Sequence, residues 1–164
     1  TQSRSSAASD VYKRQVADLH RRLANAAEDV LQILELLFIA HPPIHAVRDL
    51  ATLVKMHPGT LMSRFQRAGL PPLKRYLAFA NLVRAAQALE DPRRSIADVA
   101  VQLDYSSPQS FGRHVTLMLG MTASAFRSTY DCEGMYGRYC DEVITPVLAE
   151  LCVFRPLRAV GEPR

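Results

Sequence analysis

The 164-residue sequence contains no tryptophan, seven glycines and only three cysteines, Cys132, Cys140 and Cys152. The cysteines are odd in number and lack the paired spacing of a zinc site, so we interpret them as reduced structural thiols rather than as a disulfide framework. No Gly-rich phosphate loop is present. Without tryptophan, the core has to be built from Leu, Val and Ala with a few Phe and Tyr side chains.

Long apolar runs are also missing. The most apolar stretch, residues 30–40, is interrupted by Gln32 and Glu35 and is too short to cross a bilayer. No signal peptide is visible. These absences predict a chain that makes no contact with a membrane and is located in the cytoplasm.

Groups that carry catalysis or hold a metal are scarce too. The adjacent acidic pairs at 28–29, 90–91 and 141–142 diverge on a helix or lie at helix ends, so they do not converge as acid and base. The five histidines are scattered, none at metal-ligand spacing from a second ligand, and no Ser-His-Asp arrangement is recognisable. We therefore predict no enzymatic activity, no metal site and no cofactor.

Positive charge is concentrated in the middle of the chain. Residues 41–130 contain eleven Lys and Arg against five Asp and Glu, and the whole chain has a net charge of +4. A basic middle suits binding to backbone phosphates, although solvated helix faces often give a similar excess. The charge alone leaves both interpretations open.

The most informative pattern lies in residues 95–120. Apolar residues at i, i+3, i+4 and i+7 predict a short helix, with Ser95 and Asp98 placed as its N-cap and its first-turn acid. Residues 104–106 interrupt this period, and Ser107 followed by Pro108 can begin a second helix. Two short helices joined by a tight turn predict a helix-turn-helix. The apolar positions are Ile96, Val99, Ala100 and Leu103 in the first helix and Phe111, Val115 and Met118 in the second.

A second copy of this pattern lies upstream at a constant offset of 49 residues. The same four-position stripe recurs as Val47, Leu50, Ala51 and Val54. Met56 then matches Tyr105 in the turn, His57 stands where a capping Ser would be expected, and Pro58 begins the next helix. Duplication of this kind indicates one supersecondary unit that is used twice.

Between the two copies, residues 72–90 keep a helical period of apolar side chains and predict a long linker helix. The predicted fold is therefore all-α, with two helix-turn-helix subdomains joined by the linker helix and flanked by N- and C-terminal helices. Pro42 and Pro43 end the preceding helix. We place the double helix-turn-helix domain at residues 44–130.

Three segments resemble the DNA-binding domain of AraC-type (AraC/XylS) transcriptional regulators: VRDLATLVKMHPGTLMSRFQRAGL, PLKRYLAFANLVRAAQALED and SIADVAVQLDYSSPQSFGRHVTLMLGMTASAFRS. The likeness covers roughly residues 44–129, a little over half of the chain, and is more specific in its second half. In that family, two helix-turn-helix units bridged by a helix read two neighbouring major-groove faces, so the resemblance implies the same arrangement here. Ligand sensing in the family normally sits in a separate domain, and no such domain fits before Ile44.

The sequence departs from the family pattern at three places. Asp104-Tyr105 replaces the usual Gly-aromatic turn, and Ala123 replaces the usual Pro after the last Gly-x-Thr. Ser63 stands where a basic residue is usual, two residues before Phe65.

In the second unit, Gln109 and Arg113 lie at i and i+4 and so project from one face at the front of helix 107–119. Gln can bind adenine and Arg can bind guanine at O6 and N7, each with two hydrogen bonds. Because the resemblance matches these positions residue by residue, we predict base contacts from Gln109, Ser110 and Arg113 and a backbone contact from Ser107. The alternative is that they are merely exposed polar side chains.

In the first unit, the outward side chains of helix 58–68 are poorly suited to hydrogen-bond with bases. The corresponding outward positions are Gly59, Met62 and Ser63. Met62 could touch a thymine methyl group, although a Met beside Leu61 is more often a core filler. We predict that this unit is mainly an anchor on backbone phosphates, which carry no sequence information. The predicted backbone contacts are Thr60, Arg64 and Arg67. Four more arginines either extend this phosphate track or are ordinary solvated residues: Arg75, Arg84, Arg93 and Arg94.

The first 15 residues are rich in Ser, Ala and Arg and show no period. We predict a non-native or disordered lead and exclude residues 1–15 from the fold. The sequence starts with Thr rather than Met, so we expect it to be a fragment of a longer regulator.

Residues 16–40 carry an unbroken 3-4-3-4 spacing of apolar residues over three heptads, which predicts one amphipathic helix. Two interpretations remain open. The segment 16–39 is either the seam of a homodimer, or a helix that lies on its own domain or ends a missing upstream domain. The apolar positions are Val16, Leu19, Leu23, Ala26, Val30, Ile33 and Leu37.

Residues 131–164 give a weaker signal, and we interpret them as a C-terminal helical extension followed by a disordered tail. Thr145-Pro146 could start a helix that continues to Phe154. Packing against the 16–39 helix, in the same chain or in a partner, would explain why both segments are apolar. From Arg155 onward, the content of Pro, Gly and Arg predicts disorder.

Together these patterns predict a sequence-specific DNA-binding transcriptional regulator, associated with the nucleoid. Its predicted partner is double-stranded DNA, with RNA polymerase and a second copy of the chain as further candidates. The alternative is a helical protein-interaction module that keeps the duplicated units as a vestigial or non-specific DNA-binding scaffold. Sequence-selective, salt-dependent binding to DNA would separate the two.

Overall fold

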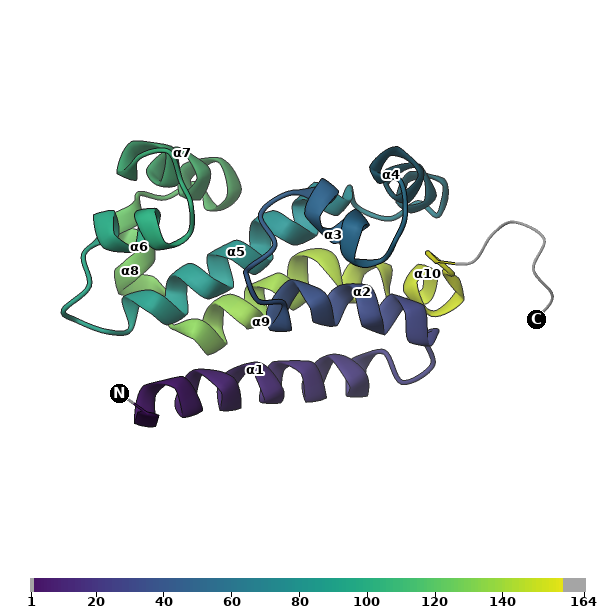
Figure 1. Cartoon of the computed structure of the whole chain (residues 1–164), viewed down its shortest axis with the longest axis horizontal. Coiled ribbons are helices and arrows are strands. Elements are labelled where there is room, and N and C mark those ends of the chain that lie inside the picture. The colour runs from purple at the N-terminus through teal and green to yellow at the C-terminus, as the bar shows by residue number, and fades with distance from the viewer. Residues whose placement is uncertain (1, 158–164) are drawn as a thin grey trace.

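The computed structural model describes the backbone of residues 2–157 and the side chains of residues 10–157. This part of the chain is helical and contains no β-strand, which confirms the predicted all-α class. A long helix, α5 (Leu73–Leu89), runs through the middle of the molecule, with one helix-turn-helix unit at each of its ends (Figure 1). Three further helices, α1, α2 and α9, lie on the other side of α5.

The first unit consists of α3 (Val47–Leu53) and α4 (Pro58–Arg67). The second consists of α6 (Ile96–Gln102) and α7 (Pro108–Leu119), and α8 (Ala123–Thr129) packs against α7. The prediction of two helix-turn-helix units joined by a long helix is therefore confirmed in its architecture.

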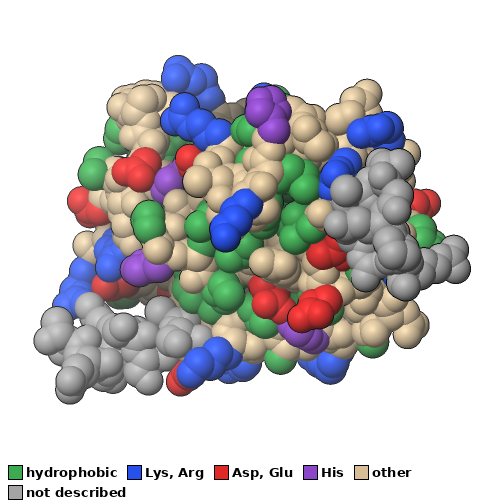
Figure 2. Space-filling model, turned by 45° about the vertical axis from the view of Figure 1, so that its right-hand side comes forward, with side chains coloured by type: hydrophobic (Ala, Val, Ile, Leu, Met, Phe, Trp, Pro, Cys, Tyr) green, Lys and Arg blue, Asp and Glu red, His purple; other side chains and the backbone are tan. Residues whose placement is uncertain are grey.

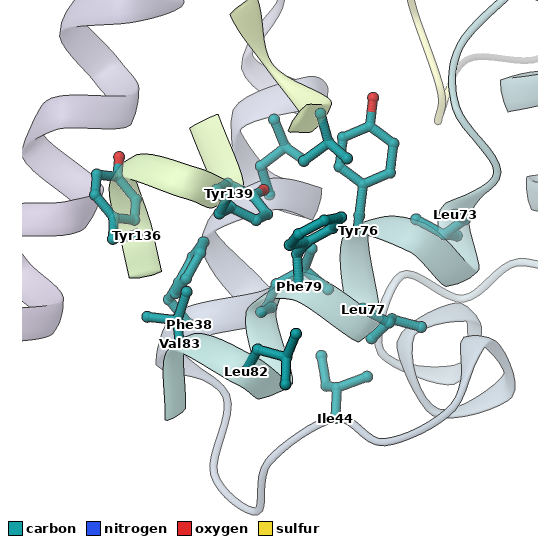
Figure 3. Packing of buried hydrophobic residues seen from close by; sticks show 14 of the residues in the cluster. Phe38, Ile44, Leu73, Tyr76, Leu77, Phe79, Leu82, Val83, Tyr136 and Tyr139 are labelled. Atoms are coloured by element: carbon teal, nitrogen blue, oxygen red, sulfur yellow. The ribbon is translucent and has the colours of Figure 1, made fainter. Parts of the chain in front are cut away.

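Helix α5 is buried on nearly all of its faces. A surface helix has one apolar stripe, whereas a helix that is apolar all round belongs in a core. Figure 3 shows the reason, because side chains of α5 such as Phe79, Leu82 and Val83 lie among Phe38 of α2 and Tyr139 of α9. The Phe38 and Tyr139 rings meet edge to face, with their centroids 5.1 Å apart. The two helix-turn-helix units are thus joined by one buried core helix.

The prediction of one continuous helix over residues 16–39 is wrong. The segment is divided between α1 (Gln2–Arg22) and α2 (Glu28–Ile39), which are antiparallel neighbours in Figure 1. The charges explain the break, since basic residues close the last turn of α1 and Glu28 and Asp29 open the first turn of α2, each favourable at that helix end. Helix α1 already begins at Gln2, so residues 2–15 are helical where the sequence predicted a disordered lead.

The apolar stripe of residues 16–39 is used inside the chain. Leu19 and Leu23 of α1 and Val30, Ile33 and Leu37 of α2 are all buried in the common core. Because these side chains already pack against their own domain, the structure supports the second interpretation of the segment rather than the dimer seam.

The C-terminal extension packs against the same helices. It contains α9 (Cys132–Val143), a 3₁₀ turn η1 (Thr145–Val147) and α10 (Leu148–Val153). The Tyr136 hydroxyl of α9 donates to the Gln15 carbonyl oxygen of α1 at 3.0 Å, and the Tyr136 ring lies edge to face with Phe38. The predicted packing against residues 16–39 therefore occurs within one chain. Of the predicted tail, Pro156 accepts a hydrogen bond from Arg64 of α4 and Leu157 donates one to Asp29 of α2, and residues 158–164 lie outside the described residues.

Two of the four additional arginines have structural partners in this core. Arg84 is only 7% exposed and donates from Nη2 to the Leu37 carbonyl oxygen at 2.7 Å. Burial lowers the pKa of Arg84, and its guanidinium lies over the Tyr12 ring. Arg75 pairs with Glu142 of α9 at 2.6 Å. Arg84 is thus a buried link between α2 and α5, and its suggested place in a phosphate track is wrong.

Candidate nucleic-acid interface

The turns of the two units repeat each other hydrogen bond by hydrogen bond. The Met56 amide donates to the Ala51 carbonyl at 2.9 Å, and the Tyr105 amide donates to the Ala100 carbonyl at the same distance. Lys55 and Asp104, also 49 residues apart, both adopt left-handed backbone, with φ of 54° and 57°. The apolar offset seen in the sequence is therefore a true repeat of backbone geometry.

The first helices of the two units begin with the same acidic residue. The Asp98 carboxylate accepts from the Ser95 amide at 2.8 Å, and Asp49 accepts from the Ala46 amide at 3.0 Å. Ser95 also returns the bond, because its hydroxyl oxygen accepts from the Asp98 amide at 3.0 Å. Ala46 has no side-chain acceptor, so α3 carries half of the capping box that α6 carries in full.

The second helices begin with different caps. Ser107 accepts from the Ser110 amide through its hydroxyl at 3.1 Å, whereas His57 accepts from the Gly59 amide through Nδ1 at 3.1 Å. The two caps are 50 residues apart, so the second turn is longer by one residue. When α4 and α7 are aligned at their caps, Gly59 of α4 is equivalent to Gln109 of α7. Each later residue of α4 is equivalent to the residue 50 positions further along the chain in α7.

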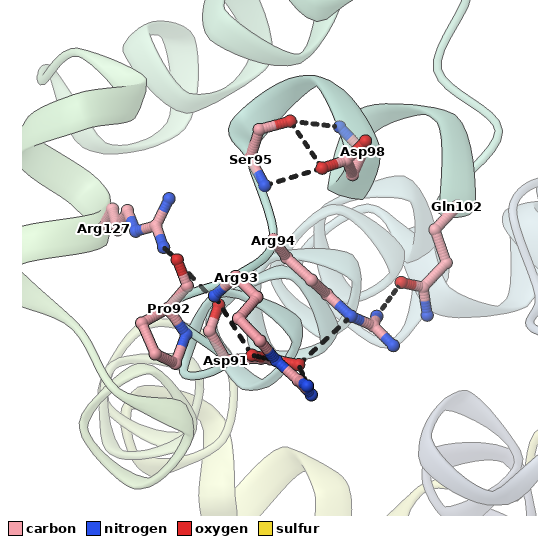
Figure 4. Close-up of polar contacts among 8 residues, drawn as sticks. All are labelled: Asp91, Pro92, Arg93, Arg94, Ser95, Asp98, Gln102 and Arg127. Carbon is pink, nitrogen blue, oxygen red and sulfur yellow. Dashed lines mark hydrogen bonds and ion pairs between the residues drawn. The ribbon is translucent and has the colours of Figure 1, made fainter.

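The loop that enters the second unit is fixed by polar contacts (Figure 4). Asp91 binds Arg93 and Arg94, at 3.2 Å and 4.0 Å for the closest atoms, and Arg127 of α8 donates to the Pro92 carbonyl at 3.4 Å. Arg94 also donates to Gln102 of α6. These bonds hold α6 and α8 to the end of α5, which is a structural use for both loop arginines.

On α7, the predicted readers Gln109 and Arg113 are exposed at the front of the helix. Neither side chain makes a hydrogen bond or an ion pair within the described residues, so both keep their donors for a ligand. Leu117, four residues beyond Arg113, continues the same row and is 83% exposed. Leu117 was not predicted from the sequence as a site residue, although its i+4 spacing from Arg113 indicated an outward position.

The two serines at the start of α7 are placed differently. The Ser110 hydroxyl donates to the Ser107 carbonyl at 2.8 Å and accepts from the Ser107 amide at 3.1 Å and from the Ser106 hydroxyl at 3.2 Å. A hydroxyl has one donor and two lone pairs, so that of Ser110 is fully used in the cap. Ser107 is the cap residue itself.

The outward positions of α4 carry less hydrogen-bonding capacity. Met62 is 40% exposed, Gly59 and Ser63 are half-buried, and Thr60 is exposed. Arg67 is also exposed, and its Nε makes a long bond of 3.4 Å to the Ser63 carbonyl of its own helix. The residues predicted for the first unit therefore lie together on α4. The exposed side chain of Met62 is apolar, whereas those of Gln109 and Arg113 on α7 are polar.

Arg64 differs from the other predicted backbone contacts. Its Nη1 donates to the Pro156 carbonyl oxygen at 2.6 Å, so at least one of its donors is used inside the molecule. The equivalent position in α7 is His114, whose Nδ1 shares a hydrogen bond with the Tyr105 hydroxyl. Burial lowers the pKa of His114 and raises that of Tyr105, so the pair is neutral near pH 7.

The two units are connected directly as well as through α5. His45, before α3, lies 3.2 Å from the Asp104 carboxylate in the turn of the second unit. The hollow beside this pair, about 360 Å³ in volume, is floored by α5 residues such as Lys74, Leu77 and Asn81. Among the described residues, no group of three or more His, Cys, Asp or Glu side chains could hold a metal ion.

Basic side chains are spread over the surface. In the view of Figure 2, the Lys and Arg side chains form separate groups rather than one continuous basic surface. On this face, therefore, the positive charge does not form one long track. No helix in the described range is long and apolar enough to cross a membrane.

A comparison with protein-family models matches residues 50–129 to a helix-turn-helix domain of the AraC type. Comparisons with curated proteins and with solved structures gave no match. The matched range begins inside α3 and ends with α8, so it covers both units and the helix between them. Residues 50–129, with their repeated turns and paired second helices, are therefore an AraC-type helix-turn-helix domain, a DNA-binding domain of transcriptional regulators.

Proposed function

We propose that the chain binds double-stranded DNA sequence-specifically and reads two adjacent major-groove segments, one with α4 and one with α7. The observation that supports this most strongly is the repeated turn, since the same hydrogen bonds precede both second helices and α5 joins the two units. Recognition helices of this motif enter the major groove with their N-terminal residues at the base edges.

In this proposal α7 supplies most of the sequence selectivity. Gln109 binds adenine and Arg113 binds guanine at O6 and N7, and each such pair contributes about 1–3 kcal/mol of discrimination. Both side chains are exposed without an internal partner in the described structure, so neither has to break a bond before it contacts DNA. Leu117 adds an apolar contact further along the same row.

In the same proposal α4 supplies affinity. Met62 contacts an apolar base edge such as a thymine methyl, and Thr60 and Arg67 bind phosphates. We assign the hydroxyls of Ser107 and Ser110 to the helix cap rather than to DNA, because their hydrogen bonds are made within the turn.

The test is a pair of charge deletions on a duplex recovered from a random-sequence pool. Arg113→Ala should weaken binding to that duplex by about 5- to 150-fold and relax the preference at one base pair. Arg67→Ala should weaken binding evenly across sequences and reduce the salt dependence by about one phosphate contact.

Arg21→Ala is the matched control. It removes the same charge from an exposed position on α1, which lies on the side of the molecule away from α4 and α7 (Figure 1). DNA binding should be unchanged by it. If neither Arg113→Ala nor Arg67→Ala altered DNA binding, the helical protein-interaction module would replace this proposal.

A further inference from the structure

The end of the described chain lies against the first reading helix. The Pro156 carbonyl accepts from Arg64 of α4 at 2.6 Å, and the Phe154 ring meets the Phe65 ring edge to face at 4.9 Å. Phe154 and Pro156 are both buried. Two consecutive residues of α4 are thus held by one short segment, Phe154–Leu157, which we call the brace.

The brace is itself attached to the N-terminal helices. The Leu157 amide donates to the Asp29 carboxylate at the start of α2, at 3.1 Å, and Leu151 of α10 is 1% exposed in the common core. The segment therefore connects α4 to a part of the molecule that α4 does not reach through its own turn. The brace also lies beyond residues 50–129, so it is an addition to the helix-turn-helix domain.

The second unit is stabilised in another way. His114, which occupies the position of Arg64, bonds to Tyr105 of its own turn, and the Phe111 ring packs on Tyr105 and on Phe126 of α8. All of these partners lie inside the helix-turn-helix domain. Helix α7 is therefore held by its own unit and by α5, while α4 is held by its own unit and by residues at the far end of the chain.

We infer that the brace positions α4 for DNA, with Arg64 and Phe154 as the positioning residues. Two helices can enter adjacent groove segments together only if their separation is fixed, and a loosened α4 would lose its contacts without affecting those of α7. This inference rests on the proposed DNA binding, but its structural half can be measured without DNA.

The first measurement is amide hydrogen exchange on the full chain without DNA. Arg64→Met keeps the length of the side chain and removes its donors, so it should speed exchange of the α4 amides about tenfold or more and leave those of α7 unchanged. Phe154→Ala should have the same pattern with a larger effect. Arg64→Lys retains a donor and should restore most of the protection.

The second measurement is a hydroxyl-radical footprint on the pool-selected duplex. Arg64→Met and Phe154→Ala should lose protection over the segment covered by α4 and retain it over the segment covered by α7. Val153→Ala is the control, because Val153 immediately precedes the brace as the last residue of α10 and is 76% exposed.

The outcomes are distinct. Unchanged exchange in α4 for Arg64→Met would overturn the brace, even if Phe154→Ala failed to fold. Faster exchange with an intact footprint would overturn its role in positioning. Weaker DNA binding by Arg64→Met without faster exchange would show instead that Arg64 contacts phosphate. If the unaltered protein bound no DNA at all, the proposed function would fail while the exchange result still decided whether the brace holds α4.

Discussion

The two helix-turn-helix units share the hydrogen bonds and the left-handed residue of the turn, and they differ in their surfaces. At equivalent positions, α7 presents Gln109 and Arg113 where α4 presents Gly59 and Ser63. The repeat thus fixes how a helix is presented, and the outward side chains decide what that helix can recognise. This difference is the reason we propose that α7 reads bases and that α4 holds the backbone.

The units also differ in what supports them. The aromatic contacts of the second unit stay within α6 to α8, whereas Phe65 of the first contacts Tyr76 of α5 and Phe154 of the C-terminal segment. The C-terminal segment therefore supports the first unit and not the second, while α6, α7 and α8 of the second unit all pack against α5.

The largest effect is expected from deleting a buried ring in each unit. Phe111 and Phe65 are both almost completely buried, so Phe111→Ala and Phe65→Ala should each lower the free energy of unfolding by about 3–5 kcal/mol. Hydrogen exchange should then rise in α6 to α8 for Phe111→Ala, but in α4 and α10 for Phe65→Ala. The same exchange pattern for both variants would contradict the difference in support.

The next largest effect is a difference in base selectivity between α7 and α4. Gln109→Ala should reduce discrimination at one adenine by about 1–3 kcal/mol, since a bidentate contact is lost. Met62→Ala removes only an apolar contact and should change selectivity by less than about 1 kcal/mol. Competition binding with single-base variants of the selected duplex measures both. An equal or larger loss for Met62→Ala would mean that α4 reads bases as well as α7 does.

The caps should differ by a smaller amount. Ser107→Ala removes an acceptor for the Ser110 amide and should cost about 1 kcal/mol of stability, in the usual range for an N-cap serine. His57→Ala should cost less, because an imidazole is not one of the preferred N-cap side chains. Urea denaturation at constant pH gives both values. A larger cost at His57 would show that its ring does more than cap α4.

Glycine substitutions at the two left-handed turn residues, Lys55 and Asp104, should raise the stability of the protein instead of lowering it. Lys55→Gly should stabilise the protein by up to about 1 kcal/mol, because a residue with a Cβ is strained at a φ of 54° and glycine is not. Asp104→Gly should gain less, since Asp tolerates this conformation better and its contact with His45 would be lost. Thermal or urea denaturation would show whether the order is reversed.

The smallest difference concerns pH. Burial lowers the pKa of His114 below its ordinary value of 6.5, so the unfolded chain takes up a proton before the folded chain does. The stability from neutral His114 is therefore complete above about pH 6.5 and is lost as the pH falls through the lowered pKa. His114→Gln should reduce the slope of stability against pH in this window. A substitution at Arg64, the equivalent position in α4, should leave the slope unchanged.

The repeat was predictable from the sequence because its signals are local. The apolar stripe, the capping pair Ser95 and Asp98, and Pro58 and Pro108 at helix starts each act within a few residues. The outward positions of α7 followed from the same spacing. Even the cap formed by His57 was indicated by its place in the repeat.

Features that depend on distant partners were not predictable. Helix α9 contains Gly134 and Gly137, which weaken a helical signal, and it is stabilised by packing of Tyr136 and Tyr139 against α1, α2 and α5. Arginine is normally a surface residue, and the burial of Arg84 is favourable only because its guanidinium contacts the Leu37 carbonyl and the Tyr12 ring. The role of Arg64 depends in the same way on Pro156, 92 residues further along the chain.

The break between α1 and α2 lies between these cases. Its signals were present as basic residues before Leu23 and acidic residues after Ala27, but the apolar period continues across the break. The period is preserved because both helices contribute to the same core. An apolar spacing therefore indicated which side chains are buried, and it did not show where the helix ends.

The most direct test of the account is selection of bound duplexes from a random DNA pool by the unaltered protein. Two half-sites should be recovered about one helical turn, roughly 10 base pairs, apart, one strongly constrained by α7 and the other weakly constrained by α4. Arg113→Ala should relax the constrained half-site and leave the spacing intact. Recovery of no motif would contradict the proposed readout, as would two half-sites constrained with equal strength.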